Sequence, residues 1–274
     1  MKIINETITQ LGQPATLQVR LWDNSQEYQT GVKRPAIVVV PGGGYHYVSD
    51  READPVANAF MAMGYHTAVL RYTVEKGVYP AQLQQLAAAV ALLRSHENDW
   101  YIDPDKIVVM GFSAGGHLAA SLAVHWHESW LSEALGVPNE AIRPNLAVLA
   151  YAVLIAGEHT HEGSWKRLLG ENWESLWREM SLDRHVTAQT PPCFLWCNGG
   201  DTTVPLENSL AFASALRRCG VPFELHCYEK GKHGASLCNE VVRKKPETKF
   251  YRSVSLWVEQ CHLWLHQQFD PDFC

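Results

Sequence analysis

The sequence predicts an α/β fold with a mainly parallel central sheet and helices on both of its faces. Short runs rich in β-branched residues alternate along the chain with longer runs of helical character. Repeated β-α-β units of this kind form parallel sheets, because the helix returns the chain to the edge where the next strand starts. Continuous apolar runs such as AIVVV at 36–40 are typical of strands covered on both faces. Sheets of this class bind ligands at the carboxyl ends of their strands.

The individual elements follow from apolar pattern and helix end signals. Alternation of apolar and polar residues predicts a half-exposed strand over Ala15–Trp22. An early proline and a terminal glycine bound a helix over Pro55–Met63. Short apolar runs predict the strands Ala36–Val40, Thr67–Leu70, Lys106–Met110, Leu146–Tyr151, Cys193–Cys197 and Phe223–Tyr228. Longer patterns predict the helices Ala81–Arg94, Ala114–Val124, Glu207–Arg218 and Ser253–Gln267.

One domain is expected over residues 1–274, because neither an internal repeat nor a low-complexity linker divides the sequence. The stretch from about 157 to 189 interrupts the alternation of strands and helices. It carries Trp165, Trp173 and Trp177 among charged residues. We expect it to be an insertion over the strand ends that forms a lid or a pocket wall; a helix packed on the sheet surface is the alternative.

Charge and composition exclude several classes of partner. The formal net charge of −6 and the lack of a Lys/Arg cluster argue against nucleic-acid binding. No run approaches the ~20 apolar residues that span a bilayer. The N-terminus has no apolar secretory segment, so a complete gene product would stay in the cytoplasm. The seven cysteines, an odd number without a CxxC pair, are expected to be reduced thiols.

The turn Gly111-Phe112-Ser113-Ala114-Gly115 is the strongest chemical motif in the sequence. It lies between a predicted buried strand and a predicted helix, which is the setting of a nucleophile elbow. The nucleophile of such a turn has a strained backbone, and the residues two positions before and after it approach other backbone closely. Only very small residues fit there, as Gly111 and Gly115 do. We therefore expect Ser113 to be a nucleophile.

A serine nucleophile needs a base that is itself oriented by a carboxylate. Asp201 follows the predicted strand Cys193–Cys197 on a glycine-rich loop, and His233 follows the next strand in Gly-Lys-His-Gly. The order Ser, Asp, His is the one expected after a nucleophile elbow. His117 lies one helical turn after Ser113 and is expected to pack or hydrogen-bond behind the elbow. We therefore expect Ser113, Asp201 and His233 to form the catalytic group.

Acyl transfer also needs N–H donors for the oxyanion. One donor is expected from the backbone of Ala114, and the others from Gly43 and Gly44 in the PGGGY segment that follows the AIVVV strand. Neither a metal nor an organic cofactor is expected. The pairs His125/His127 and His159/His161 suggest metal ligation, but without a third convergent ligand a surface or packing role is preferred.

Four aromatic residues are candidates for lining an acyl or sugar site, namely Tyr45, Tyr151, Trp165 and Trp173. Each has a structural role as its alternative.

Together these segments resemble the α/β-hydrolases, and more narrowly the small acetyl esterases related to acetylxylan esterases and hormone-sensitive-lipase-like enzymes. The matching segments are PGGGY (41–45), GYHTAVLRY (64–72), GFSAGGHLAA (111–120), TPPCFLW (190–196), GDTTVP (200–205) and GKHG (231–234). The resemblance implies an α/β-hydrolase fold. It also implies deacetylation of small or carbohydrate esters, with acetylated oligosaccharides among the substrates.

Two other functions are compatible with the same residues. The first is an amide hydrolase, aminopeptidase-like or formamidase-like, that uses the same three catalytic residues. The second is a non-catalytic binding protein on a hydrolase fold, which would typically have lost Ser or His. The sequence does not fix the oligomeric state.

Overall fold

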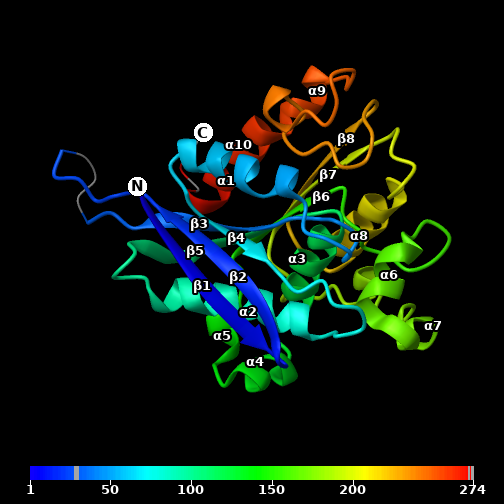
Figure 1. Ribbon diagram of the computed structural model, residues 1–274, viewed down its shortest axis with the longest axis horizontal. Helices are drawn as coiled ribbons and strands as arrows, with labels where there is room; N and C mark the ends of the chain where they lie inside the picture. Colours follow the sequence, from blue (N-terminus) through cyan, green and yellow to red (C-terminus); the bar gives the residue numbers. More distant parts are fainter. Residues whose placement is uncertain (28–30, 271, 273–274) are drawn as a thin grey trace.

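The computed structural model describes residues 1–27, 31–270 and 272 (Figure 1). Its centre is one eight-stranded sheet with the strand order β1-β2-β4-β3-β5-β6-β7-β8. The six strands from β4 to β8 in that order run parallel, and β1 and β2 form an antiparallel pair at one edge. The predicted α/β class with a mainly parallel sheet is confirmed.

The strands are β1 (Lys2–Gln10), β2 (Gln13–Leu21), β3 (Arg34–Val40), β4 (His66–Arg71), β5 (Ile102–Phe112), β6 (Leu146–Ala150), β7 (Cys193–Asn198) and β8 (Phe223–Tyr228). All seven predicted strands are present, with bounds that differ mainly at their ends. The strand β1 was not predicted from the sequence. Most of its side chains are exposed and Ile8 is its buried residue, so this edge strand carries little apolar signal.

The main helices are α1 (Asp54–Ala62), α2 (Ala81–Ser95), α3 (Ala114–His125), α8 (Glu207–Arg218) and α10 (Trp257–Phe269). Shorter helices are α4 (Ser129–Leu135), α5 (Asn139–Ile142), α6 (Glu162–Leu169), α7 (Trp173–Leu176) and α9 (Arg252–Ser255). The predicted helix Ser253–Gln267 is thus wrong as a single element, because it is divided at Leu256 into α9 and α10.

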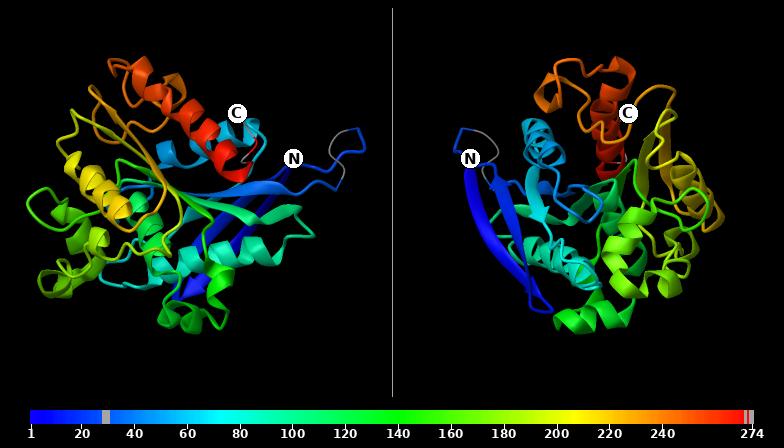
Figure 2. Two further views of the ribbon diagram at one scale, coloured as in Figure 1. Left: turned by 180° about the vertical axis from the view of Figure 1, so that it is seen from behind. Right: turned by 45° about the vertical axis from the view of Figure 1, so that its right-hand side comes forward.

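Helices lie on both sides of the sheet (Figure 2), and an apolar layer covers each of its faces. Successive residues of a strand point to opposite faces, so Val38 and Val40 join one layer while Ile37 and Val39 join the other. Side chains of α2, α3 and α8 pack in the first layer. Side chains of α1 and α10 pack in the second. Burial on both faces explains the continuous apolar runs of the central strands.

The segment 157–189 folds into α6, α7 and the single-turn 3-10 helices Gly170–Asn172 and Leu182–Arg184. Figure 1 shows α6 and α7 beyond the end of α3, on the side of α8. The face of α6 that carries Trp165, Leu168 and Leu169 is buried in the first apolar layer. The segment therefore contributes to the core through α6, and its action as a lid stays a prediction.

Candidate active site

Ser113 lies at the sharp turn between β5 and α3, with a φ of 54°. This left-handed conformation is strained for a residue with a side chain. A Cβ at Gly111 would lie 2.2 Å from the carbonyl oxygen of Gly115, and a Cβ at Gly115 would lie 2.1 Å from that of Val40. The two glycines are thus required by close backbone approach, as predicted. The turn presents Ser113 above the carboxyl end of β5, at the N-terminus of a helix.

The structure brings the three predicted catalytic side chains into one hydrogen-bonded chain. The Oγ atom of Ser113 is 2.7 Å from Nε2 of His233. Nδ1 of His233 is in turn 2.7 Å from Oδ2 of Asp201. The carboxylate orients the imidazole, and the imidazole faces the hydroxyl as a general base would.

The loops that carry Asp201 and His233 follow β7 and β8, so both begin at the same edge of the sheet as the elbow. The side chain of Asp201 is fully buried. Its second oxygen, Oδ1, accepts the backbone N–H groups of Thr203 and Val204 at 2.9 and 3.0 Å. These bonds fix the carboxylate independently of the histidine, so Oδ2 is directed at His233.

The glycine loop after β3 lies directly against the elbow. A Cβ at Gly42 would lie 2.9 Å from Cβ of Ser113. Gly43 and Gly44 have φ values of 126° and 61°, which side chains disfavour. Within the part of the chain that the structure describes, the N–H groups of Gly43, Gly44 and Ala114 make no hydrogen bond to another group. They are available as donors beside the serine, which is where an oxyanion would form.

Glu52 is a residue of this site that the sequence analysis missed. It is 4% exposed and belongs to the 3-10 turn Asp50–Glu52. Its Oε2 accepts the N–H of Gly42 at 2.9 Å, and its Oε1 accepts the hydroxyl of Tyr151 at 2.7 Å. The same hydroxyl accepts the N–H of Ser236, in the loop after His233. Glu52 therefore connects the glycine loop to the histidine loop.

Three of the four aromatic candidates, Tyr45, Tyr151 and Trp165, are buried, each with 1% of its surface exposed. The polar atom of each forms a hydrogen bond inside the protein: Tyr45 with His117, Tyr151 with Glu52, and Trp165 with Thr160. Their contact with substrate stays a prediction. Trp173 is partly exposed next to Lys166, and its contact with substrate stays a prediction.

His117 packs behind the elbow, as expected. Its Nδ1 is 2.7 Å from the hydroxyl of Tyr45, and its ring lies edge-on to Trp165. Burial lowers the pKa of His117 to about 3 and raises the pKa of Tyr45 well above its usual value. The imidazole is thus neutral at physiological pH, and its Nδ1 shares a hydrogen bond with the phenol hydroxyl.

His161 reaches the site from the segment 157–189. It caps α6, accepting the N–H of Ser164, and its Cε1 lies 3.9 Å from where a Cβ of Gly44 would be. Burial is the main cause that lowers the pKa of His161, followed by the nearby His233. The pair His159/His161 is the sequence feature that pointed to it, but its role as a helix cap beside the glycine loop depends on the tertiary fold.

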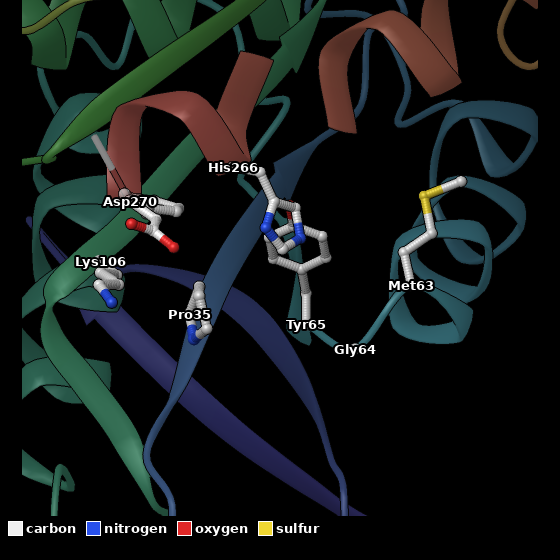
Figure 3. A pocket seen from close by; sticks show the side chains of 8 residues that line it. Pro35, Met63, Gly64, Tyr65, Lys106, His266 and Asp270 are labelled. Carbon is white, nitrogen blue, oxygen red and sulfur yellow. The ribbon is translucent and has the colours of Figure 1, made fainter. Parts of the chain in front are cut away.

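A pocket of about 260 Å³ lies away from the catalytic group (Figure 3). It is lined by Pro35 near the start of β3, by Lys106 of β5, by Tyr65 just before β4, and by residues of α10 and of the chain after it. These positions mark the amino ends of the strands, whereas Ser113, Asp201 and His233 lie at the carboxyl ends. This pocket is therefore separate from the candidate active site.

The six cysteines in the described part of the chain form no disulfide, as predicted, and Cys274 lies outside that part. Among the described residues, no helix combines the length and the apolar character that crossing a bilayer requires.

The sequence and the fold of this chain are similar to those of known proteins. The model of the family described as BD-FAE matches residues 24–216. Endo-1,4-beta-xylanase B of Butyrivibrio fibrisolvens is 36% identical over 76% of this chain, and acetylxylan esterase of Xylanibacter ruminicola is 30% identical over 73%. The chain spans 34% and 40% of the lengths of these two relatives.

Solved structures match over nearly the whole chain. Carboxylesterase Cest-2923 of Lactobacillus plantarum WCFS1 superposes with a TM-score of 0.88 and 29% identity, covering 98% of both chains. An acetyl ester-xyloside bifunctional hydrolase of Caldicellulosiruptor lactoaceticus has a TM-score of 0.78 and 36% identity, covering 92% of this chain and 88% of the other.

Proposed function

The chain belongs to the BD-FAE family and has the α/β-hydrolase fold of acetylxylan esterase-like enzymes, and from this premise we propose that it is a carboxylic ester hydrolase with a serine nucleophile. One observation carries the proposal. The atoms Ser113 Oγ, His233 Nε2, His233 Nδ1 and Asp201 Oδ2 form a chain with two hydrogen bonds of 2.7 Å. This arrangement activates a hydroxyl for attack on a carbonyl carbon.

In the first half-reaction, His233 takes the proton of Ser113 as Oγ attacks the ester carbonyl. The negative charge that develops on the carbonyl oxygen is stabilised by the N–H groups of Gly43, Gly44 and Ala114. His233 then donates its proton to the departing alcohol, and an acyl-serine remains. Asp201 stabilises the imidazolium that forms in this step.

In the second half-reaction, a water molecule attacks the acyl-serine while His233 accepts its proton. The same N–H groups stabilise the second tetrahedral oxyanion. The proton on His233 returns to Oγ of Ser113 as the carboxylic acid leaves, which restores the starting state. The residues present supply every proton transfer in this sequence.

The proposed substrates are acetyl esters of small alcohols or carbohydrates, including acetylated oligosaccharides. Two relatives support this class, the acetylxylan esterase of Xylanibacter ruminicola and the acetyl ester-xyloside bifunctional hydrolase of Caldicellulosiruptor lactoaceticus. An amide substrate for the same catalytic residues remains the second candidate, and acylamino-acid-releasing enzyme 1 of Oryza sativa subsp. japonica matches at 20% identity over 85% of this chain.

The test compares Ser113→Ala with wild type on p-nitrophenyl acetate and on an N-acetyl-aminoacyl p-nitroanilide. We expect the ester to be the preferred wild-type substrate, and the variant to lose at least about 10⁴-fold in kcat. A fluorophosphonate probe should label wild type and leave Ser113→Ala unlabelled. Ser121→Ala is the matched control, because Ser121 lies on the same helix and its hydroxyl donates a hydrogen bond to the carbonyl of His117 and not to His233. Undiminished ester hydrolysis by Ser113→Ala would overturn the proposal.

A further inference from the structure

Three possible metal ligands converge at the C-terminal end of α3, far from the catalytic group. They are His125, the last residue of α3, Glu128 in the turn that follows, and His185 just after the 3-10 helix Leu182–Arg184. Their ligand atoms all lie within 4.8 Å of one another. The sequence pattern suggested His125 and His127 as a pair of metal ligands without a third. The fold instead brings His125 together with the carboxylate of Glu128 and with His185, some 60 residues later in the chain.

The three side chains are already oriented toward one another. Nδ1 of His125 is 2.8 Å from Oε1 of Glu128, and the rings of His125 and His185 have centroids 4.8 Å apart. Ligands of a tetrahedral zinc ion lie roughly 3.3 Å apart. Rotations that move the side-chain tips by about an ångström would therefore place all three on one ion.

Hydrogen bonds to groups outside the cluster orient two of the three side chains. The Nε2–H of His185 donates to the carbonyl of Glu179 at 2.7 Å, which leaves Nδ1 with a lone pair. The second oxygen of Glu128, Oε2, accepts the indole N–H of Trp130. Hydrogen bonds of this kind are the usual second layer around zinc-binding histidines and carboxylates.

His127, two residues after His125, has a buried Nδ1 without a hydrogen-bond partner among the described residues.

We propose that His125, Glu128 and His185 form a Zn²⁺ site that links the end of α3 to the segment 157–189. Two imidazoles and one carboxylate are a ligand set that zinc accepts, with water in the fourth position. Since α3 rises about 1.5 Å per residue, His125 lies roughly 18 Å along the helix from Ser113. The site would therefore stabilise the fold and take no part in the ester chemistry.

The test uses the full chain without a histidine tag, stripped with a chelator and dialysed. Calorimetric titration with ZnCl₂ should give one Zn²⁺ per chain, and titration with CoCl₂ should give the visible absorption of a tetrahedral site. Zn²⁺ should also raise the Tm, because an ion that binds the folded state stabilises it. His185→Gln is the main variant, since His185 follows a surface turn and its loss leaves α3 complete. We expect it to weaken Zn²⁺ binding at least roughly tenfold, as loss of a ligand requires.

His226→Gln is the matched control. His226 is also paired with a glutamate, because its Nε2 is 2.6 Å from Oε1 of Glu224. Unlike His185, it belongs to no group of three possible metal ligands among the described residues. This variant should bind Zn²⁺ as wild type does. The proposal is overturned if the wild-type chain binds no Zn²⁺, or if His185→Gln binds it with wild-type affinity. Circular dichroism establishes that both variants are folded before titration.

Discussion

Oε2 of Glu52 accepts the backbone N–H of Gly42 at 2.9 Å, inside the protein and immediately beside Ser113. A buried carboxylate usually has a cationic partner or several hydrogen bonds. Glu52 is stabilised by hydrogen bonds, and the hydroxyl of Tyr151 is its other donor. Its hydrogen bond to Gly42 fixes the start of the loop that carries the proposed oxyanion donors, Gly43 and Gly44.

Replacing Glu52 with Gln should lower kcat while KM changes little. The amide has one oxygen to serve two donors, so either Gly42 or Tyr151 loses its acceptor and faces an N–H group instead. Removing an oxyanion donor outright costs about 10²–10³-fold in kcat, and a displaced loop should cost less, roughly 10–100-fold. Steady-state kinetics with p-nitrophenyl acetate measure both constants. Glu97→Gln, at an exposed glutamate paired with Lys33, is the control and should behave as wild type.

The change Asp201→Asn should leave the fold intact and nearly abolish turnover. An asparagine oxygen can still accept the N–H groups of Thr203 and Val204, so the loop should keep its shape. The amide then faces Nδ1 of His233 and cannot stabilise an imidazolium. In the serine-protease case the corresponding change costs about 10⁴-fold in kcat, and we expect a loss of this order. A variant that retained more than a tenth of wild-type kcat would argue against Asp201 as the orienting carboxylate.

Gly115→Ala should prevent normal folding. The added Cβ would lie 2.1 Å from the carbonyl oxygen of Val40 and 2.3 Å from that of Pro41, and neither backbone atom can move without shifting β3. Gly136→Ala is an informative comparison. Gly136 has a φ of 66° but nothing within 4 Å of the new atom, so strain alone should cost about 1–2 kcal/mol. Thermal melts of the soluble fraction separate the two cases, and a Gly115→Ala protein with wild-type Tm would contradict the contact geometry.

The unfolding free energy should decrease as the pH falls below about 6.5. His117 has a pKa of about 3 in the folded chain, and the unfolded chain has the ordinary histidine value. The unfolded state therefore binds the extra proton between these values, and each pH unit costs about 1.4 kcal/mol for this one group. Its contribution is fully present above pH 6.5 and is lost progressively toward pH 3. His66, with a pKa lowered by burial to about 4, acts in the same direction.

Urea unfolding at pH 7.0 and pH 5.0 measures this dependence. His117→Gln should reduce the difference in unfolding free energy between the two pH values, because it removes one of the titrating groups. His46→Gln, at an exposed position, should not change the difference. An unaltered pH dependence in His117→Gln would mean that this histidine is not the group that titrates.

The arrangement of Ser113, Asp201 and His233 was predictable from sequence because its parts are local. Gly111 and Gly115 flank Ser113 in one pentapeptide, and Asp201 and His233 each follow an apolar strand on a glycine-rich loop. A parallel sheet brings the ends of such strands to one edge, so their order along the chain was sufficient to join them.

Features that depend on side-chain packing between distant segments were not predictable in this way. Glu52 has no local signature, and its role appears only when the glycine loop and Tyr151 are placed on either side of it. The same holds for the aromatic candidates, because a large ring near a site motif is equally suited to fill the core, and Tyr45 and Trp165 are buried there. The proposed ligand set of His125 was hidden because His185 lies in a segment with weak periodicity.

Arg167 of α6 donates from Nε to the carbonyl of Tyr45 and from Nε and Nη2 to that of Val74. The segment 157–189 is thus hydrogen-bonded to Tyr45, the residue that ends the glycine loop. This attachment matters for protein engineering, because an exchange of 157–189 between family members would also exchange Arg167. A graft that omits the arginine would remove its hydrogen bonds to the carbonyls of Tyr45 and Val74. Chimeras should therefore keep Arg167 and vary the residues around it.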